Sequence, residues 1–228
     1  MKEKYFVKKI SRLTAKKLLD EYHYLHLEGG NFRSGINFGL FDKNTLLLIG
    51  VCVFHTNSAK EIVKGCLGIQ SYKLDGFYEL GRLCLNPHFF EKNITSYFLG
   101  ASIRLLRKLT SITALLTYAD TGKHIGYIYQ ACNFKYYGLT SPKKDFFYND
   151  KNGVEVKLQR GKCKHLDGEW RDKTQKHRYL IIYDKSLNTI WEQQPYPKGE
   201  QSADFNNAIT DKGKQVFMPK ESAQTTLF

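Results

Sequence analysis

Two charged residues, Arg82 and Asp120, stand within or just after short apolar segments of the sequence. The segments 79–85 and 112–118 have the length and composition of buried strands. A guanidinium in a buried strand requires a carboxylate or phosphate partner, so Arg82 could bind a group donor or pair with Asp120. A carboxylate that ends a parallel strand stands where substrate crevices form, so Asp120 could hold a substrate amine or act as a base.

Both residues also have a purely structural interpretation. Arg82 could belong to an ion pair that only fixes the fold, and Asp120 could cap a helix that follows it directly. Regular alternation of side chains along the first strand predicts that Arg82 shares a face with Leu80, whereas Glu79 lies on the opposite face.

A turn and a predicted amphipathic helix, which begins near Asn93, join the two segments. Strand, helix and strand in this order form a βαβ unit, so the two strands should run parallel. Backbone N–H groups at the start of the helix could hold the pyrophosphate of a cofactor. The residues concerned are Asn93, Ile94, Thr95 and Ser96. The Ser96 hydroxyl could also bind a donor carbonyl, or simply cap the helix.

Histidines supply candidates for metal binding. His23, Tyr24 and His26 follow a predicted helix and precede two glycines, which indicates a loop that faces the substrate. His23 and His26 would reach one metal ion if this stretch is helical. With Asp120 they could form the two-histidine, one-carboxylate set that binds Fe(II), although two histidines alone do not make a site.

Aromatic side chains could contact a ring of the substrate. Tyr24 and Tyr129 could stack on such a ring or donate a proton to a leaving group, although aromatic residues at such positions more often belong to the core. His124 could act as a base or, with Lys123, contact a phosphate. Further predicted contacts with the substrate come from His23, Tyr118 and Arg178.

The charge balance predicts a polyanionic partner. The 228 residues carry a formal net charge of +13, which favours nucleic acid over a generic basic surface. Loops rich in charge surround Trp170, and their cations are predicted to contact a DNA backbone or to form a solvated face. These cations are Lys143, Lys144, Lys162, Lys164, Arg171, Lys173, Lys176 and Arg178.

Composition limits the class of protein. A hydrophobic content of 42% excludes a mainly disordered chain and predicts one α/β domain over 1–185, followed by an extended or partly disordered tail over 186–228. Five cysteines without a CxxC spacing, no apolar signal region and no run of membrane-spanning length predict a cytoplasmic protein.

The order of predicted elements gives a mixed sheet of six or seven strands with helices on both faces. The remaining elements are a helix over 15–22 capped by Thr14, a hairpin of 36–41 and 46–54, a loop over 56–71, short strands at 146–148 and 154–158, and a last strand at 177–183.

The succession of strand, turn, helix and strand, followed by the segment 126–138, resembles the core of the GNAT acyltransferase fold. Asn133 and Phe134 stand in place of that superfamily's glycine–phenylalanine strand start. The resemblance implies a mixed α/β fold whose mostly antiparallel sheet contains one parallel, splayed strand pair with flanking helices. The turn 89–95 lacks the superfamily's glycine-rich pyrophosphate loop, which argues against ordinary acyl-CoA binding.

A narrower resemblance, over about residues 10–185, is to the bacteriophage Mom family of GNAT-like DNA adenine-modification enzymes. It rests on the order and spacing of the segments 22–25, 79–83, 96–99, 118–120, 124–126, 129–131 and 177–179. This resemblance implies that adenine N6 in double-stranded DNA receives a carbamoylmethyl (acetamido) group, which protects phage DNA from host restriction. It also implies an acyl or glycyl-type donor, with acetyl-CoA among the candidates, and an Fe(II) requirement.

Three functions therefore compete. The first is a Mom-like enzyme with Asp120, Arg82, Tyr24, Ser96 and Tyr129 in its active site. The second is an acyl-CoA-dependent N-acyltransferase that acts on a protein or a small amine. The third is a catalytically inactive basic protein that binds DNA on the same scaffold.

Overall fold

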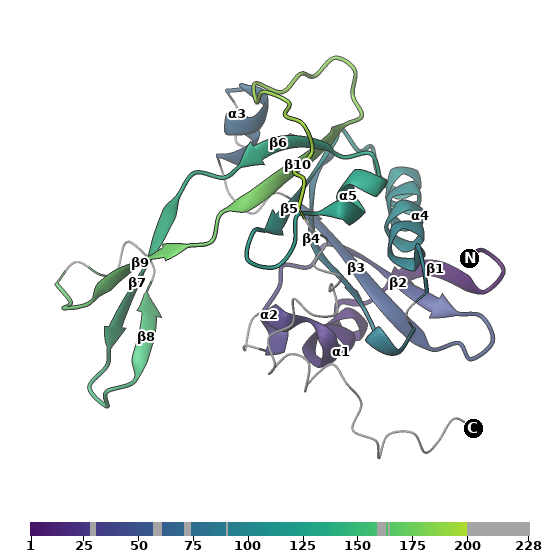
Figure 1. Ribbon diagram of the computed structural model, residues 1–228. Coiled ribbons are helices and arrows are strands. Elements are labelled where there is room, and N and C mark those ends of the chain that lie inside the picture. The colour runs from purple at the N-terminus through teal and green to yellow at the C-terminus, as the bar shows by residue number, and fades with distance from the viewer. Residues whose placement is uncertain are drawn as a thin grey trace.

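A seven-stranded sheet forms the centre of the fold (Figure 1). The computed structural model describes residues 1–27, 31–56, 61–70, 74–89, 91–158, 163 and 165–199. The strand order in the sheet is β1-β2-β3-β4-β5-β10-β6. In chain order these strands are β1 (Tyr5–Ile10), β2 (Ile36–Asp42), β3 (Leu48–Thr56), β4 (Phe77–Leu85), β5 (Ala114–Asp120), β6 (Lys135–Leu139) and β10 (Lys176–Ile182).

The sheet is mixed. β4 and β5 run parallel, and the five other neighbouring pairs of this sheet, all within the described residues, are antiparallel. The predicted hairpin is β2 and β3, and the predicted βαβ unit runs from β4 to β5. The predicted α/β fold with one parallel strand pair is therefore confirmed.

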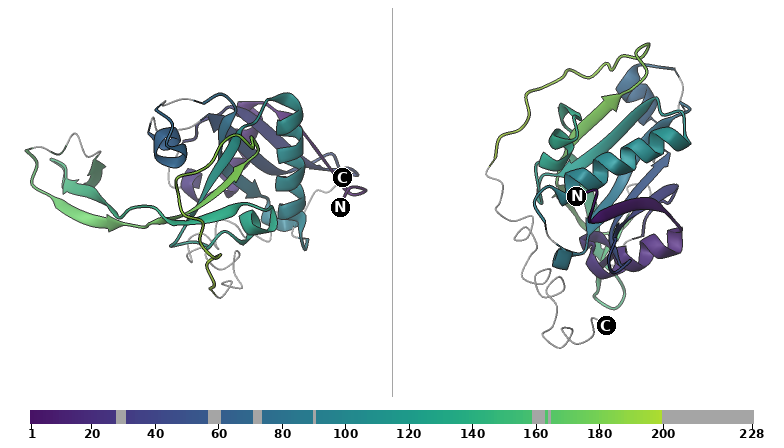
Figure 2. Two further views of the ribbon diagram at one scale, coloured as in Figure 1. Left: turned by 90° about the horizontal axis from the view of Figure 1, so that it is seen from above. Right: turned by 90° about the vertical axis from the view of Figure 1, so that its right-hand side faces the viewer.

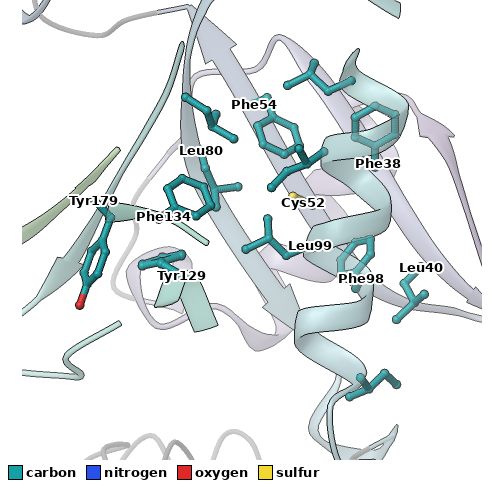
Figure 3. Packing of buried hydrophobic residues seen from close by; sticks show 14 of the residues in the cluster. Phe38, Leu40, Cys52, Phe54, Leu80, Phe98, Leu99, Tyr129, Phe134 and Tyr179 are labelled. Atoms are coloured by element: carbon teal, nitrogen blue, oxygen red, sulfur yellow. The ribbon is translucent and has the colours of Figure 1, made fainter. Parts of the chain in front are cut away.

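Two helices cover one face of the sheet, α4 (Ile94–Leu109) and α5 (Tyr127–Ala131). Phe98 and Leu99 of α4 are fully buried against side chains from the centre of the sheet, as Figure 3 shows. α4 begins where the sequence predicts, after Asn93, whose φ of 65° lies in the left-handed region that asparagine tolerates.

The opposite face carries α1 (Arg12–Tyr22) and α3 (Ile62–Leu67), and α2 (Tyr24–Leu27) follows α1 (Figure 1). The predicted cap of α1 is wrong: the helix starts after Ser11, whose hydroxyl accepts the N–H of Thr14 at 3.0 Å. The region of α3 was expected to be a loop, because a glycine inside it weakens the helical pattern.

The parallel strands pair over a short distance and then part. Phe77–Leu80 of β4 lies beside Ala114–Thr117 of β5. At the end of this stretch the Thr117 hydroxyl donates to the backbone oxygen of Leu80 (3.2 Å). Beyond it β4 stays paired with β3 and β5 stays paired with β10, so the two strands keep their outer partners as they diverge.

A β-bulge in β4 marks the point of divergence. Val53 of β3 pairs with Arg82, and its neighbour Phe54 pairs with Leu80, which leaves Gly81 without a partner in the register. A bulge of this kind bends its strand and increases the local twist. The bulge thus explains why β4 turns away from β5 at this residue.

A second, three-stranded sheet projects from the domain; we call it the arm (Figures 1 and 2). Its strands are β7 (Lys143–Asn149), β8 (Glu155–Leu158) and β9 (Glu169–Lys173), in the order β8-β7-β9. The arm continues the ribbon made by β6 and β10. Two of its strands were predicted, but β9 was not, because its sequence is almost wholly charged.

The segment 184–199 has no regular structure and packs along the domain. The Trp191 ring lies 6.2 Å from that of Tyr137, and the N–H of Gln194 donates to the backbone oxygen of Tyr136 on β6 (2.9 Å). Residues 200–228 of the predicted tail lie outside the described residues, so the domain boundary at 185 remains a prediction. No helix in the described part of the chain is long and apolar enough to cross a membrane.

The bulge makes a prediction about stability. A Cβ added to Gly81 would collide with Nε2 of the buried His55, so Gly81→Ala should lower the free energy of unfolding by about 1–3 kcal/mol. Gly65→Ala is the control, because a Cβ on that helical glycine meets nothing within 4 Å; it should raise the stability by about 0.5–1 kcal/mol. Urea denaturation measures both, and equal stability of Gly81→Ala and the wild type would contradict the contact.

Candidate active site between the parting strands

The bulge decides which side chains of β4 share a face of the sheet. Arg82 stands opposite Val53 on the side covered by α1, whereas Leu80 packs in the core beneath α4. The prediction that Arg82 and Leu80 share a face is therefore wrong, because the extra residue, Gly81, interrupts the alternation. Glu79 precedes Leu80 in the regular part of the strand, so Glu79 and Arg82 lie on the same face.

Arg82 is half-buried and is held by backbone oxygens. Its Nη1 donates to Gly81 (2.7 Å) and its Nη2 donates to Asn31 (3.1 Å). Burial lowers the pKa of Arg82, whereas the neighbouring Tyr24 and Glu79 raise it. The guanidinium is thus fixed in orientation and stays close to both an acidic side chain and the segment after α1.

Glu79, Tyr118 and Arg178 extend this polar face across three neighbouring strands. Tyr118 and Arg178 are partners in the β5–β10 register. Burial raises the pKa of Tyr118, Glu79 raises it further, and Arg178 opposes the shift. Arg178 also lies 4.4 Å from the centre of the Trp191 ring. The sequence analysis missed Glu79, and the glycine two residues after it, inside a strand pattern, was the signal for a bulge.

Four buried polar atoms in this region have no hydrogen-bond partner among the described residues. They are Nε2 of His26, Oε2 of Glu79, Nε of Arg82 and Nε of Arg178. Ser102 has the only other such atom in the described chain. Because an unsatisfied buried polar group costs about 1–3 kcal/mol, so many in one region is typical of a site that binds a polar ligand.

The segment after α1 lies against Arg82. The His23 ring stacks on Tyr24 with 4.7 Å between centroids, and His26 meets His23 edge-on at 5.7 Å. Nδ1 of His26 lies 2.9 Å from a carboxylate oxygen of Asp20. Burial lowers the pKa of His23 to about 3, and Arg82 contributes to that shift. The structure therefore brings the predicted Tyr22–His26 region and Arg82 together.

Tyr24 also approaches the opposite wall, which the loop after β5 and α5 supply. Nζ of Lys123 lies 5.4 Å from the centre of the Tyr24 ring. The His124 ring lies 6.2 Å from that of Tyr129. Burial lowers the pKa of His124 to about 4 and raises that of Tyr129 to about 12, with an opposing hydrogen bond from Thr117. Tyr129 is part of the packed core as well (Figure 3).

Asp120 anchors the base of the arm. One carboxylate oxygen accepts the N–H of Gly122 (3.0 Å), and the other accepts the hydroxyl of Thr174 (3.0 Å), which lies between β9 and β10. In the described part of the chain no hydrogen bond or ion pair joins Asp120 to Arg82, so the predicted pair is not formed. The predicted helix directly after Asp120 is a turn, and α5 begins at Tyr127.

The start of α4 is the predicted cofactor site. The residues predicted there, Asn93, Ile94, Thr95 and Ser96, form the cap and first turn of the helix. The Ile94 side chain is buried in the core, and its N–H donates to the backbone of Glu91 (3.0 Å). The Ser96 hydroxyl donates to the backbone oxygen of Asn93 (3.0 Å). Glu91, just before the helix, forms an ion pair with Lys4 (3.1 Å). A carboxylate beside this turn does not fit a pyrophosphate.

The predicted metal site is not assembled. No group of three or more His, Cys, Asp and Glu side chains in the described regions is arranged to hold a metal ion. Asp120 is held by the arm, and Nδ1 of His26 is occupied by Asp20. The described residues therefore do not fit the Fe(II) site that was predicted from His23, His26 and Asp120.

The predicted DNA-contact cations differ in their surroundings. Arg171 binds Glu155 at 2.7 Å and Glu169 at 2.9 Å, and Lys144 pairs with Asp172 at 3.7 Å. Arg178 lies beside Tyr118 of β5 rather than on the arm, at the edge of the gap between the diverging strands β4 and β5, which we call the crevice. Lys162 and Lys164 lie outside the described residues. The remaining three, Lys143, Lys173 and Lys176, stand at or near the base of the arm.

The buried histidines predict a pH dependence of stability. His23 and His124 keep low pKa values of about 3 and about 4 in the folded protein, whereas an unfolded chain binds their protons near pH 6.5. Because the unfolded state then binds more protons, stability should fall as the pH drops from about 6.5 to about 4, by about 1.4 kcal/mol per pH unit for each histidine.

Urea denaturation between pH 7 and pH 4 measures this slope. His23→Gln and His124→Gln should each lower the slope of stability against pH by the contribution of one histidine, about 1.4 kcal/mol per pH unit. His88→Gln, at an exposed position, should leave the slope unchanged. Identical slopes for all variants and the wild type would contradict the burial of neutral histidines.

Comparisons with known proteins name a family. No curated protein matches the sequence. Similar solved structures include a GNAT-family acetyltransferase from Bacillus anthracis (13% identity, 78% of this chain and 95% of that chain, TM-score 0.46). An IAA acetyltransferase from Bacillus cereus ATCC 14579 gives 15% identity, 78% of this chain, 99% of that chain and a TM-score of 0.47.

At these identities the likeness concerns the fold alone, and the fold assignment rests on the strand order described above. The model of the Mom protein family matches residues 4–198. This match includes all elements of the crevice and the arm, and it supports a Mom-type function. The chain therefore belongs to the Mom protein family.

Proposed function

We propose that the protein is a transferase that modifies adenine N6 in double-stranded DNA to the carbamoylmethyl form and so protects phage DNA from restriction. Family membership supports this proposal. The observation that carries it is the set of unpartnered buried polar atoms on Glu79, Arg82, Arg178 and His26 beside the parted strands.

These groups suit the edge of a nucleobase. Adenine offers a donor at N6 and acceptors at its ring nitrogens, and an enzyme that modifies it reads these after the base leaves the stack. The crevice offers an acceptor on Glu79 and donors on Arg82 and Arg178. Tyr24, which already stacks on His23, supplies an aromatic surface for the extruded ring.

The chemistry requires removal of one proton from N6, whose lone pair is delocalised into the ring. Glu79 is placed to accept this proton, because its free oxygen lies beside Arg82 on the crevice face. N6 then bonds to the methylene carbon of a carbamoylmethyl group that the donor carries on a leaving group. The donor's leaving group takes the electron pair of the broken bond and a proton, and the Tyr129 hydroxyl is the proposed source of that proton.

The competing functions are less well supported. An acyl-CoA N-acyltransferase would need a pyrophosphate site, but Glu91 and the buried Ile94 stand at the start of α4. A protein that only binds DNA would have no reason to keep four buried polar atoms without partners, since each lowers stability.

The proposal is tested by expressing the protein in a bacterium, digesting plasmid DNA to nucleosides and analysing them by mass spectrometry. A deoxyadenosine derivative heavier by the mass of one carbamoylmethyl group in place of hydrogen is the expected product. Unmodified DNA together with tight acetyl-CoA binding would favour the N-acyltransferase, and unmodified DNA with salt-sensitive DNA retention would favour a binding protein.

Glu79 gives the sharpest catalytic prediction. Glu79→Gln keeps the shape but cannot accept the proton, so the rate of modification should fall about 10²–10⁴-fold. DNA affinity should be retained within about twofold, because the affinity of such proteins comes mainly from backbone contacts. Glu21→Gln, at an exposed position on α1, is the matched control. Full activity of Glu79→Gln would exclude it as the base.

Asp120 is expected to act through the arm. Thr174→Val removes the hydroxyl that Asp120 accepts, so it should reproduce the loss of activity caused by Asp120→Asn, in both cases with weaker DNA binding. Thr140→Val, elsewhere at the base of the arm, is the control. If Asp120→Asn abolishes modification while Thr174→Val and DNA affinity stay normal, Asp120 takes part in the chemistry itself.

A further inference from the structure

We infer that the arm lies along the duplex on one side of the target adenine and binds its phosphate backbone with lysines at its base. This inference rests on the proposed function, because it takes double-stranded DNA as the substrate. It adds a binding surface outside the crevice, and it predicts that the protein covers more base pairs on one side of the target adenine than on the other.

The arm is built to keep its shape away from the body of the domain. On one of its faces Phe146, which is 3% exposed, packs against Trp170 with 5.2 Å between ring centroids. On the other face Arg171 binds both oxygens of Glu155 (3.0 and 2.7 Å) and lies 4.7 Å from the ring of Phe147. The projecting sheet therefore has a small core and ion pairs of its own, and these stabilise its shape.

The ion pairs also show which cations are free to meet a partner. Arg171 is neutralised by two glutamates, so it stabilises the arm. Lys143 and Lys173 stand directly opposite each other across β7 and β9, an arrangement of like charges that destabilises a strand pair. Lys173 has one distant carboxylate at 3.7 Å. Lys143 takes part in no ion pair among the described residues.

These lysines continue a basic track that begins at the crevice. Lys123 lies over the Tyr24 ring at the crevice wall. Lys176 follows on β10, beside Asp120 in the register, and the Lys143–Lys173 pair comes next at the base of the arm. The track therefore leads from the position proposed for the extruded base to the projecting sheet.

A DNA backbone fits this surface because it is a continuous line of anions, whereas among the described residues Lys173 is the only cation of the track with an ion pair. The seven residues of β7 span about 23 Å at ~3.3 Å per residue. At 3.4 Å per base pair this length corresponds to about seven base pairs. The arm should therefore enlarge the occupied site by about seven base pairs on one side.

Two variants test the inference by DNA binding, independently of the chemistry. Lys143→Gln combined with Lys173→Gln removes two charges from the track. Lys108→Gln combined with Lys185→Gln removes two exposed charges elsewhere and is the matched control. The affinity for a 40-base-pair duplex is measured by fluorescence anisotropy over a range of NaCl concentrations. The first variant should lower the slope of log K against log [NaCl] by about two, and the control should lower it by less than half as much.

A third variant removes the arm itself. Replacing residues 145–171 by Asn-Gly closes the ribbon after the Lys144–Asp172 pair with a turn suited to a hairpin. Tight-binding titration of a long duplex should then give a site smaller by about five base pairs, because the deletion removes five of the seven residues of β7. Circular dichroism checks that the domain stays folded, and the lysine variant keeps the test valid if it does not.

Unchanged slope and unchanged site size would overturn the inference. Loss of a dimer on removing the arm, with DNA binding intact, would do so as well, and would assign the arm to a second copy of the chain. Unmodified plasmid adenine alongside arm-dependent DNA binding would instead contradict the proposed chemistry and leave the arm's role standing.

Discussion

The parting of two parallel strands is the constraint on which the rest of the structure depends. β4 and β5 pair only as far as Leu80 and Thr117, and the extra residue Gly81 then bends β4 away. β4 stays paired with β3 and β5 stays paired with β10, so the hydrogen bonds of these outer pairs are kept where β4 and β5 diverge. The same extra residue turns Arg82 to the face of Glu79. One bulge therefore opens the crevice and also supplies it with opposite charges.

The crevice holds its polar groups against a cost in stability. Buried polar atoms without partners destabilise a fold unless the surroundings hold them in place. Here the surroundings are a closely packed core under α4 on one side (Figure 3) and backbone oxygens around Arg82 on the other. The buried His23 ring adds to this packing because it stacks on Tyr24 with 4.7 Å between ring centroids. A ligand that satisfies these atoms would recover the lost free energy.

Much of the fold could be predicted from the sequence, but the arrangement of the site could not. Apolar runs and the helix after Asn93 predicted the parallel pair, because burial fixes such patterns. Three errors have physical reasons. The bulge at Gly81 interrupted the alternation that was used to place Glu79. A charged strand, β9, was missed because its almost wholly charged sequence has no apolar strand pattern. The predicted pair of Asp120 with Arg82 was wrong because the Asp120 carboxylate instead accepts the hydroxyl of Thr174, which lies 54 residues away in sequence.

The most direct test of the account is a crystal structure of the protein bound to a duplex that carries its target adenine. The account predicts an extruded adenine between the diverging β4 and β5, with N6 within hydrogen-bond distance of the Glu79 carboxylate and the ring edge near Arg82. It also predicts phosphates beside Lys143 and Lys173. An adenine that remains stacked in the duplex, or that binds away from Glu79 and Arg82, would contradict the account.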